Sequence, residues 1–146
     1  MIKEAYVSYE IAKLLKEKGF DSDEVGCHGG FYSQRCYESG HGITTQSGQE
    51  VGIVYDDLTN SNLEYDEYLR PTHQMACAWL RERNICITPE IHITQDPKDY
   101  FWSATIFYLD KPWDIIQFVY EESKSISEGY DDVIEQAIKY SLENLI

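Results

Sequence analysis

The spacing of apolar and polar positions predicts a helix close to the start of the chain. Apolar residues recur at helical spacing directly after Ser8, a residue type that favours the N-cap position. Gly19 is placed to end the helix in a left-handed conformation, and Phe20 then folds back on the last turn. We therefore predict a first helix over Tyr9 to Lys18.

A second helix is predicted to begin at Pro71 and Thr72. The proline prevents extension of the helix towards the N-terminus, and the threonine hydroxyl is suited to capping it. One face of this helix carries the apolar residues, which are Met75, Ala76, Trp79 and Leu80. The pattern ends near Asn84.

The clearest periodic segment runs from Asp131 to Ile146. Asp131 and Asp132 are predicted at the positively charged start of this helix. A single apolar stripe follows them, formed by Val133, Ile134, Ala137, Ile138, Leu142, Leu145 and Ile146. This third helix is expected to be part of the core.

Three segments between the second and third helices have strand character. Apolar residues alternate with polar ones over Ile85 to Ile93, except at Pro89, which indicates an edge strand or a bulge. The aromatic and β-branched segment Tyr100 to Leu109 is expected to pair with it as a hairpin, and Ile115 to Glu121 is predicted as a third strand.

The order of these elements predicts an α+β fold. A two- to three-stranded antiparallel sheet is packed by about three helices, in the order helix, long loop, helix, strands, helix. A length of 146 residues is typical of one domain, so residues 1–146 are expected to form a single domain.

The segment from Asp21 to Glu50 is predicted as a long loop, because glycine, serine and threonine interrupt every periodic pattern there. Three short pieces are candidates for brief strands that hold this loop, namely 31–32, 36–37 and 51–55. The stretch 56–66 that follows is polar and acidic.

The net charge of −14 argues against direct binding to a nucleic-acid backbone, which requires clustered Lys and Arg. The acidity is concentrated in the middle of the chain. Between Asp21 and Glu67 ten acidic residues stand against one basic residue, Arg35. A basic partner is compatible with this charge.

The chain shows neither the layout of a secretory signal nor an apolar run long enough to span a membrane. A cytoplasmic location without membrane binding is therefore expected. In that reducing compartment Cys27, Cys36, Cys77 and Cys86 are expected to be free thiols.

The most concentrated set of metal-ligand residues is Cys27, His28, Cys36 and His41, whose thiolates and imidazoles are zinc ligands. Their spacing departs from the closely spaced pairs of structural zinc sites, which favours a surface loop. His73 and Cys77 stand one helical turn apart, and a structural role is favoured for them as well.

No other motif supports a cofactor, so none is expected. The acidic stretch 56–67 fails to place oxygen ligands, Gly and Glu at the positions of a calcium loop. The glycines at 26–30 and 40–48 match no phosphate-binding pattern, and no catalytic motif is present.

Arg70, Arg81 and Arg83 are three of the four arginines and flank the second predicted helix. They form either a partner-binding basic edge or internal ion pairs with the neighbouring acidic loop, and ion pairs are favoured. Exposed tyrosines together with Trp102 and Trp113 are a further candidate interface.

The chain resembles short uncharacterised proteins encoded by phages and prophages of gut bacteria, some of which look related to small phage α/β sandwich domains. The resemblance covers roughly residues 5–20 and 70–146. It lies in the first helix, in Pro71-Thr72, in Trp79 to Glu82, in the aromatic hairpin from Tyr100, and in the segment from Tyr130 to Ile146. These positions are caps and core residues, so the resemblance implies an origin rather than an activity.

Three functional hypotheses remain. The first is a non-enzymatic accessory protein that binds another, unknown protein, and a homo-oligomer is compatible with it. The second is an acidic mimic of nucleic acid that blocks a DNA-binding protein. The third is a zinc-binding or thiol-dependent protein that uses Cys27, Cys36 and His41.

Overall fold

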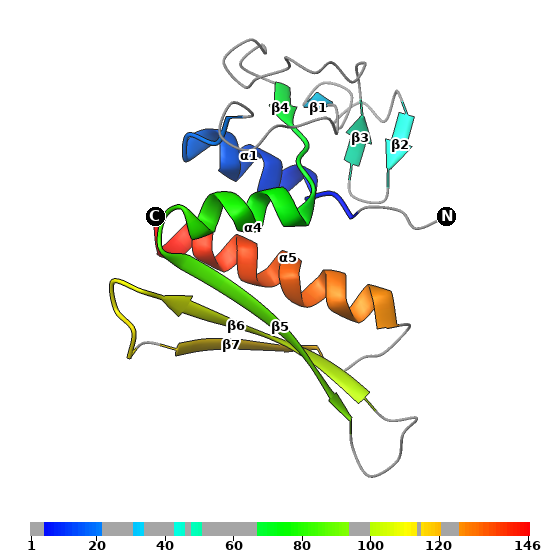
Figure 1. Cartoon of the computed structure of the whole chain (residues 1–146). Helices are drawn as coiled ribbons and strands as arrows, with labels where there is room; N and C mark the ends of the chain where they lie inside the picture. The colour runs from blue at the N-terminus through cyan, green and yellow to red at the C-terminus, as the bar shows by residue number, and fades with distance from the viewer. Residues whose placement is uncertain are drawn as a thin grey trace. The chain divides into compact units, whose positions relative to one another are not determined.

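The computed structural model describes residues 5–21, 31–33, 43–45, 48–50, 67–93, 100–113, 115–120 and 126–146 (Figure 1). The chain divides into two compact units, residues 1–79 and 80–146. The boundary lies inside the helix α4 (His73–Arg81). The expectation of one domain stays a prediction.

The first unit begins with α1 (Tyr9–Glu17), and its two ends are as predicted. The Ser8 side chain accepts a hydrogen bond from the Ile11 amide at 3.4 Å. At the other end Gly19 has a φ of 93°, and the amides of Gly19 and Phe20 donate to the carbonyls of Lys16 and Leu15. This pair of bonds is the Schellman motif, which satisfies carbonyls that the helix leaves unbonded.

The first unit also contains an antiparallel sheet that the sequence patterns did not predict. Its strand order is β2-β3-β1-β4. Each strand has three residues: β1 (Phe31–Ser33), β2 (Ile43–Thr45), β3 (Gly48–Glu50) and β4 (Glu67–Leu69). Only β1 overlaps a predicted brief strand, since the pieces at 36–37 and 51–55 lie outside the described residues.

The core of the first unit joins this sheet to α1. The buried hydroxyl of Tyr32 donates a hydrogen bond of 2.7 Å to the carbonyl of Val7. Tyr9 packs edge-on against the rings of Tyr32 and Tyr68, at centroid distances of 6.1 and 5.7 Å. The chain before α1 therefore lies against β1, and α1 lies against both β1 and β4.

The predicted second helix is α4, which begins and ends within the predicted range. The Thr72 hydroxyl accepts a hydrogen bond from the Met75 amide at 3.2 Å, as expected for its cap. The helix ends at Arg81, and Asn84 follows in the left-handed region with a φ of 64°. In the first unit Trp79 is fully buried and meets the Phe20 ring edge-on at 5.8 Å.

The second unit contains the predicted antiparallel sheet. Its strands are β5 (Ile85–Ile93), β6 (Tyr100–Tyr108) and β7 (Ile115–Tyr120), in the order β5-β6-β7. Pro89 pairs with Ala104 without interrupting β5, which is an edge strand. A proline is compatible with this place because an edge strand needs no amide donor on its outer side.

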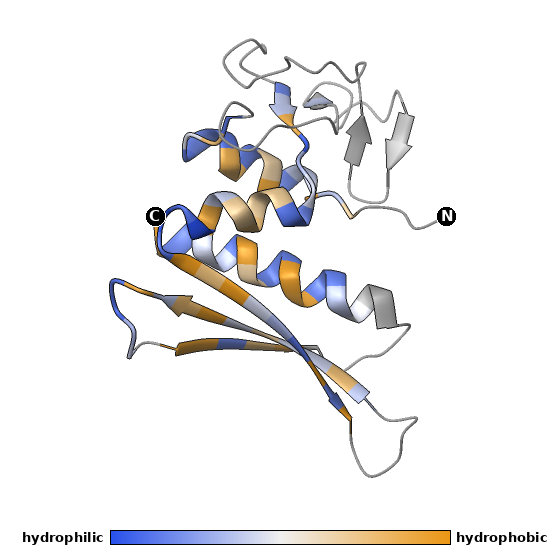
Figure 2. Ribbon diagram, viewed as in Figure 1, coloured by the Kyte–Doolittle hydropathy of each residue, from blue (hydrophilic) through white to orange (hydrophobic). Residues whose placement is uncertain are grey.

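One face of this sheet is covered by α5 (Ile126–Asn144) (Figure 1). The helix begins five residues before the predicted start at Asp131, so Asp131 and Asp132 lie beyond its first turn, which corrects their predicted position. The predicted apolar stripe is confirmed as far as Leu142, because Val133, Ala137, Ile138 and Leu142 are fully buried. At its end the prediction is wrong, because α5 ends at Asn144, Leu145 is half-buried and Ile146 is 41% exposed. Figure 2 shows the apolar residues of β5, β6 and β7 beside this helix. The α+β class and the predicted order of elements are thus confirmed.

Candidate functional site

The sheet of the second unit has one face towards α5 and one face away from it. Trp102 of β6 meets Tyr130 of α5 at 5.2 Å, and Phe118 of β7 meets Tyr140 at 5.5 Å. Because side chains alternate along a strand, their sequence neighbours point to the opposite face. We call this second face the open face; it carries Cys86, Thr88, Glu90, His92, Phe101, Ser103, Thr105, Phe107, Ile115, Gln117 and Val119.

Strand β7 forms one edge of this sheet and is apolar. Among the described residues its strand partner is β6 alone. The strand contains no charged residue, proline or glycine, and the side chains of Ile115 and Val119 are 60% and 45% exposed. An exposed, uncharged edge of this kind is a template for pairing with another strand.

The opposite edge, β5, is protected. Pro89 lacks an amide hydrogen, and Glu90 and His92 place ionisable side chains on the open face. Proline and charged side chains on an edge strand are common devices against pairing with another chain. The two edges therefore differ, and β7 is the one suited to accept a strand.

His92 is the centre of a small polar cluster on the open face. Its ring stacks on Phe101 with a centroid distance of 4.6 Å and an interplanar angle of 7°. Its Nε2 atom is hydrogen-bonded to Ser103 Oγ at 2.8 Å, and Glu90 Oε2 lies 3.8 Å from the same nitrogen.

These three residue types are those of a hydrolytic triad, but their geometry does not produce one. In a triad the serine and the carboxylate bind different nitrogens of the imidazole, whereas here both approach Nε2. Ser103 is also fully buried, so its hydroxyl is not accessible to a substrate. The cluster therefore orders the surface of the sheet rather than activating a nucleophile.

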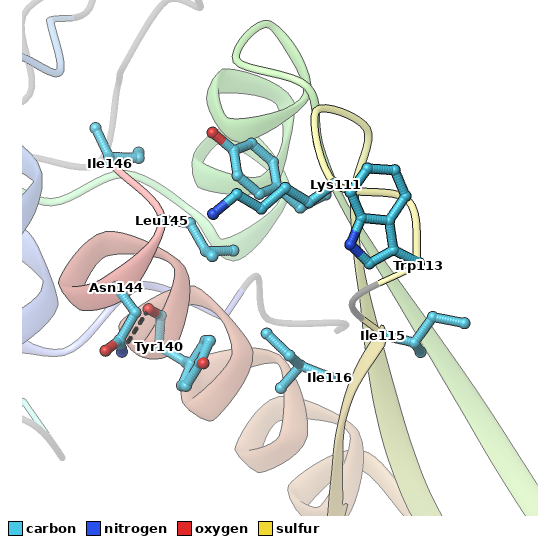
Figure 3. Close-up of a pocket in the computed structure, with 9 residues that line it drawn as sticks. Lys111, Trp113, Ile115, Ile116, Tyr140, Asn144, Leu145 and Ile146 are labelled. Atoms are coloured by element: carbon cyan, nitrogen blue, oxygen red, sulfur yellow. Dashed lines mark hydrogen bonds between the residues drawn. The ribbon is translucent and has the colours of Figure 1, made fainter.

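A pocket of about 600 Å³ lies at the end of the second unit where β6 ends and β7 begins (Figure 3). Its walls come from the β6–β7 connection and from the C-terminal part of α5. The polar and aromatic residues that line it are Tyr108, Lys111, Trp113, Tyr140 and Asn144, and the other lining residues are Ile115, Ile116, Leu145 and Ile146. This volume is in the range of sites for small organic molecules.

Some polar groups at this pocket already have partners. Asp110 accepts a hydrogen bond from Asn84 Nδ2 at 3.4 Å and another from the Tyr108 hydroxyl, and this second bond raises the pKa of Tyr108 above 10.0. Asn144 Nδ2 donates to the Tyr140 carbonyl at 3.0 Å. Among the described residues the Lys111 ammonium makes no ion pair.

The three arginines predicted as a partner site or as ion-pair donors have different environments. Arg70, in the first unit, is buried, and its guanidinium lies over the Tyr6 ring at 4.2 Å and near the Tyr32 ring at 5.7 Å. These ring contacts contribute to accommodating the buried charge. In the second unit Arg81 is exposed and Arg83 half-buried, and partner binding by the three arginines stays a prediction.

The predicted zinc ligands Cys27, His28, Cys36 and His41 lie outside the described residues. In the part of the chain that the structure describes, no group of three or more His, Cys, Asp or Glu side chains is arranged to hold a metal ion. Cys77 and Cys86 carry thiols rather than a disulfide, and His73 is buried in α4.

Comparison with family models, with curated proteins and with solved structures finds no match to this chain. None of the described helices combines the length and the apolar character needed to cross a membrane.

Proposed function

We propose that this protein is a non-enzymatic accessory protein that binds another protein by adding one of its strands to β7. The observation that carries the proposal is the difference between the two edges of the sheet. Both edge strands expose isoleucine, but β7 is uncharged, whereas β5 contains Pro89 and carries Glu90 on the open face. This difference favours pairing of the partner strand with β7 rather than with β5.

Strand addition supplies two kinds of interaction. The main chain of β7 offers hydrogen-bonding groups along its six residues, and these give affinity with little regard to sequence. On the open face Ile115 and Val119 offer apolar surface to alternate side chains of the added strand. The partner segment is therefore extended, with apolar residues at every second position.

Charge defines the partner further. The protein has a net charge of −14, and in the sequence Asp114 precedes β7 while Glu121 and Glu122 follow it. A basic segment is attracted to these carboxylates, whereas a second acidic copy of this chain is repelled. We therefore commit to a basic, extended segment of a different protein as the partner.

The test uses a short synthetic peptide in which valine alternates with lysine or threonine. We expect it to bind the full chain in calorimetry, and we expect Val119→Lys to weaken binding by about tenfold or more, because a lysine on an edge strand opposes pairing. The matched control is Ile93→Lys on β5, a side chain that is 66% exposed. This control is expected to leave binding unchanged.

Two further peptides separate main-chain pairing from charge attraction. A peptide of the same sequence with N-methylated amides on one edge keeps the charge but cannot form the ladder, so it is expected not to bind. A peptide with glutamate in place of lysine is expected to bind more weakly. Equal binding of the methylated peptide, or equal losses from Val119→Lys and Ile93→Lys, would overturn the proposal.

The origin in a phage or prophage is part of the same proposal and is supported by the resemblance of the helix caps and core positions. The nucleic-acid mimic and the zinc or thiol protein stay as alternative predictions. The acidic stretch 56–66 and the predicted zinc ligands Cys27, Cys36 and His41 lie outside the described residues.

A further inference from the structure

We infer that the pocket at the end of the second unit binds a small aromatic carboxylate, held by the Lys111 ammonium and stacked on Trp113. This inference does not rest on strand addition, because Lys111 and Trp113 lie outside β7 and the ligand is of a different class, although Ile115 of β7 also lines the pocket. Both residues line the pocket, and Figure 3 shows them on its β6–β7 side.

Trp113 supplies the first argument. Its side chain is 76% exposed, although indole is among the largest apolar groups in proteins. Tyr108 and Tyr140 line the same pocket, so a flat ring that enters meets three aromatic side chains. A volume of about 600 Å³ accommodates a ligand of one or two fused rings.

The second argument comes from Lys111, whose positive charge favours a negatively charged ligand. Its ammonium makes no ion pair among the described residues, in a chain where acidic side chains outnumber basic ones 26 to 12. The neighbouring carboxylate, Asp110, already accepts bonds from Asn84 and Tyr108. Lys111 is therefore the cation at this pocket that can receive an anion.

The α5 side of the pocket is lined by Tyr140 and Asn144, together with Leu145 and Ile146, the last residue of the given sequence. Asn144 is engaged through its amide nitrogen with the Tyr140 carbonyl. Lys111 is the one basic side chain among the residues that line the pocket, and Tyr108, Trp113 and Tyr140 give it aromatic walls, so a ligand with a carboxylate on a flat ring system matches this arrangement.

The test compares 2-naphthoate with 2-naphthamide, which has the same ring system and no charge. Binding is followed by the indole N–H signals of the three tryptophans in NMR spectra of the full chain, with the Trp113 signal assigned by Trp113→Phe. We expect naphthoate to shift the Trp113 signal and not that of Trp79. Naphthamide is expected to bind at least about tenfold more weakly, because hydrogen bonds to charged groups are the stronger ones.

The matched variants are Lys111→Gln and Lys13→Gln, which remove the same charge inside and outside the pocket. Lys13 is exposed on α1 in the first unit. Lys111→Gln is expected to reduce naphthoate affinity about tenfold, to the level of naphthamide, and Lys13→Gln is expected to leave it unchanged.

Several outcomes would overturn the inference. They are equal binding of naphthoate and naphthamide, equal losses from the two lysine variants, a shift of Trp79 in place of Trp113, and no binding up to the solubility of the probe. Each of these is separate from the result of the peptide experiment on β7.

Discussion

At the scale of single residues, the hydrogen bond between Tyr108 and Asp110 has a measurable electrostatic consequence. The Tyr108 hydroxyl donates to the Asp110 carboxylate, which raises the pKa of Tyr108 above its ordinary value of 10.0. Burial and the negative charge of Asp110 act in the same direction. The folded protein therefore holds this proton more tightly than the unfolded chain does.

We predict that Asp110→Asn lowers the pKa of Tyr108 towards its ordinary value. The pKa is measured by NMR of the tyrosine ring carbons as pH rises, with Glu143→Gln as a control that removes a different carboxylate. Because the folded pKa is the higher one, the stabilisation is complete below pH 10.0 and is lost as pH rises through the raised pKa. An unchanged Tyr108 titration in Asp110→Asn would show that this hydrogen bond does not form.

The buried face of α5 gives a second prediction at the residue scale. Ile138 is fully buried, so Ile138→Asp removes apolar contacts and places a carboxylate in the core of the second unit. A loss of about 4 kcal/mol or more in the free energy of unfolding is expected, which is enough to unfold this unit. Circular dichroism and thermal melting measure it.

The control for this variant is Gln136→Asp, which puts the same group on the exposed face of the same helix. It is expected to change stability by less than about 0.5 kcal/mol. If the two variants melt alike, the assignment of the buried face of α5 is wrong.

At the scale of elements, the end of α1 depends on one glycine. Gly19 has a φ of 93°, and a Cβ atom built on it meets nothing within 4 Å. The cost of a side chain there is therefore backbone strain alone. We predict that Gly19→Ala lowers the free energy of unfolding by about 1 kcal/mol, measured by urea denaturation.

Lys13→Ala is the comparison for Gly19→Ala, because it introduces the same residue at an exposed helical position. Alanine is favourable there, so little or no loss is expected. A loss as large as that of Gly19→Ala would mean that the left-handed cap does not explain the effect.

The elements that the sequence predicts correctly carry strong local signals. The cap at Ser8, the cap at Thr72 and the period-two pattern of β5 all act over a few neighbouring residues. The first unit's sheet gave no such signal, because three residues are too few to show a period of two and their pairing is non-local. Local patterns therefore predicted the second unit better than the first.

The early start of α5 shows tertiary packing overriding local preference. Gly129 is unfavourable inside a helix, and the apolar stripe begins only after it. In the folded unit, however, Tyr130 packs edge-on against Trp102 of β6, which stabilises the added residues of the helix. That contact joins segments far apart in the sequence.

One part of the candidate site could be predicted from the sequence and the other could not. The sequence shows that β7 is an uncharged segment between acidic residues. That β7 lies at an edge of the sheet follows only from the strand order of the folded unit. The pocket was not predictable, because Lys111 and Trp113 line the same pocket as Tyr140 and Asn144 only when α5 packs on the sheet.

At the scale of the whole molecule, the net charge of −14 and the uncharged edge strand act together. Mutual repulsion between copies opposes pairing of β7 with β7, while a basic segment is attracted from a distance. Binding of the basic peptide is therefore predicted to weaken as salt concentration rises, which calorimetry at two ionic strengths measures. An affinity that does not depend on salt concentration would show that the partner need not be basic.

The most direct test of the account is amide hydrogen exchange along β7 in the full chain, with and without the basic peptide. Amides of β7 that face away from β6 have no strand partner among the described residues, and strand addition gives them one. The account predicts that the peptide slows exchange at these amides and leaves β5 unchanged. Binding that leaves exchange in β7 unchanged, or that protects β5 instead, would contradict it.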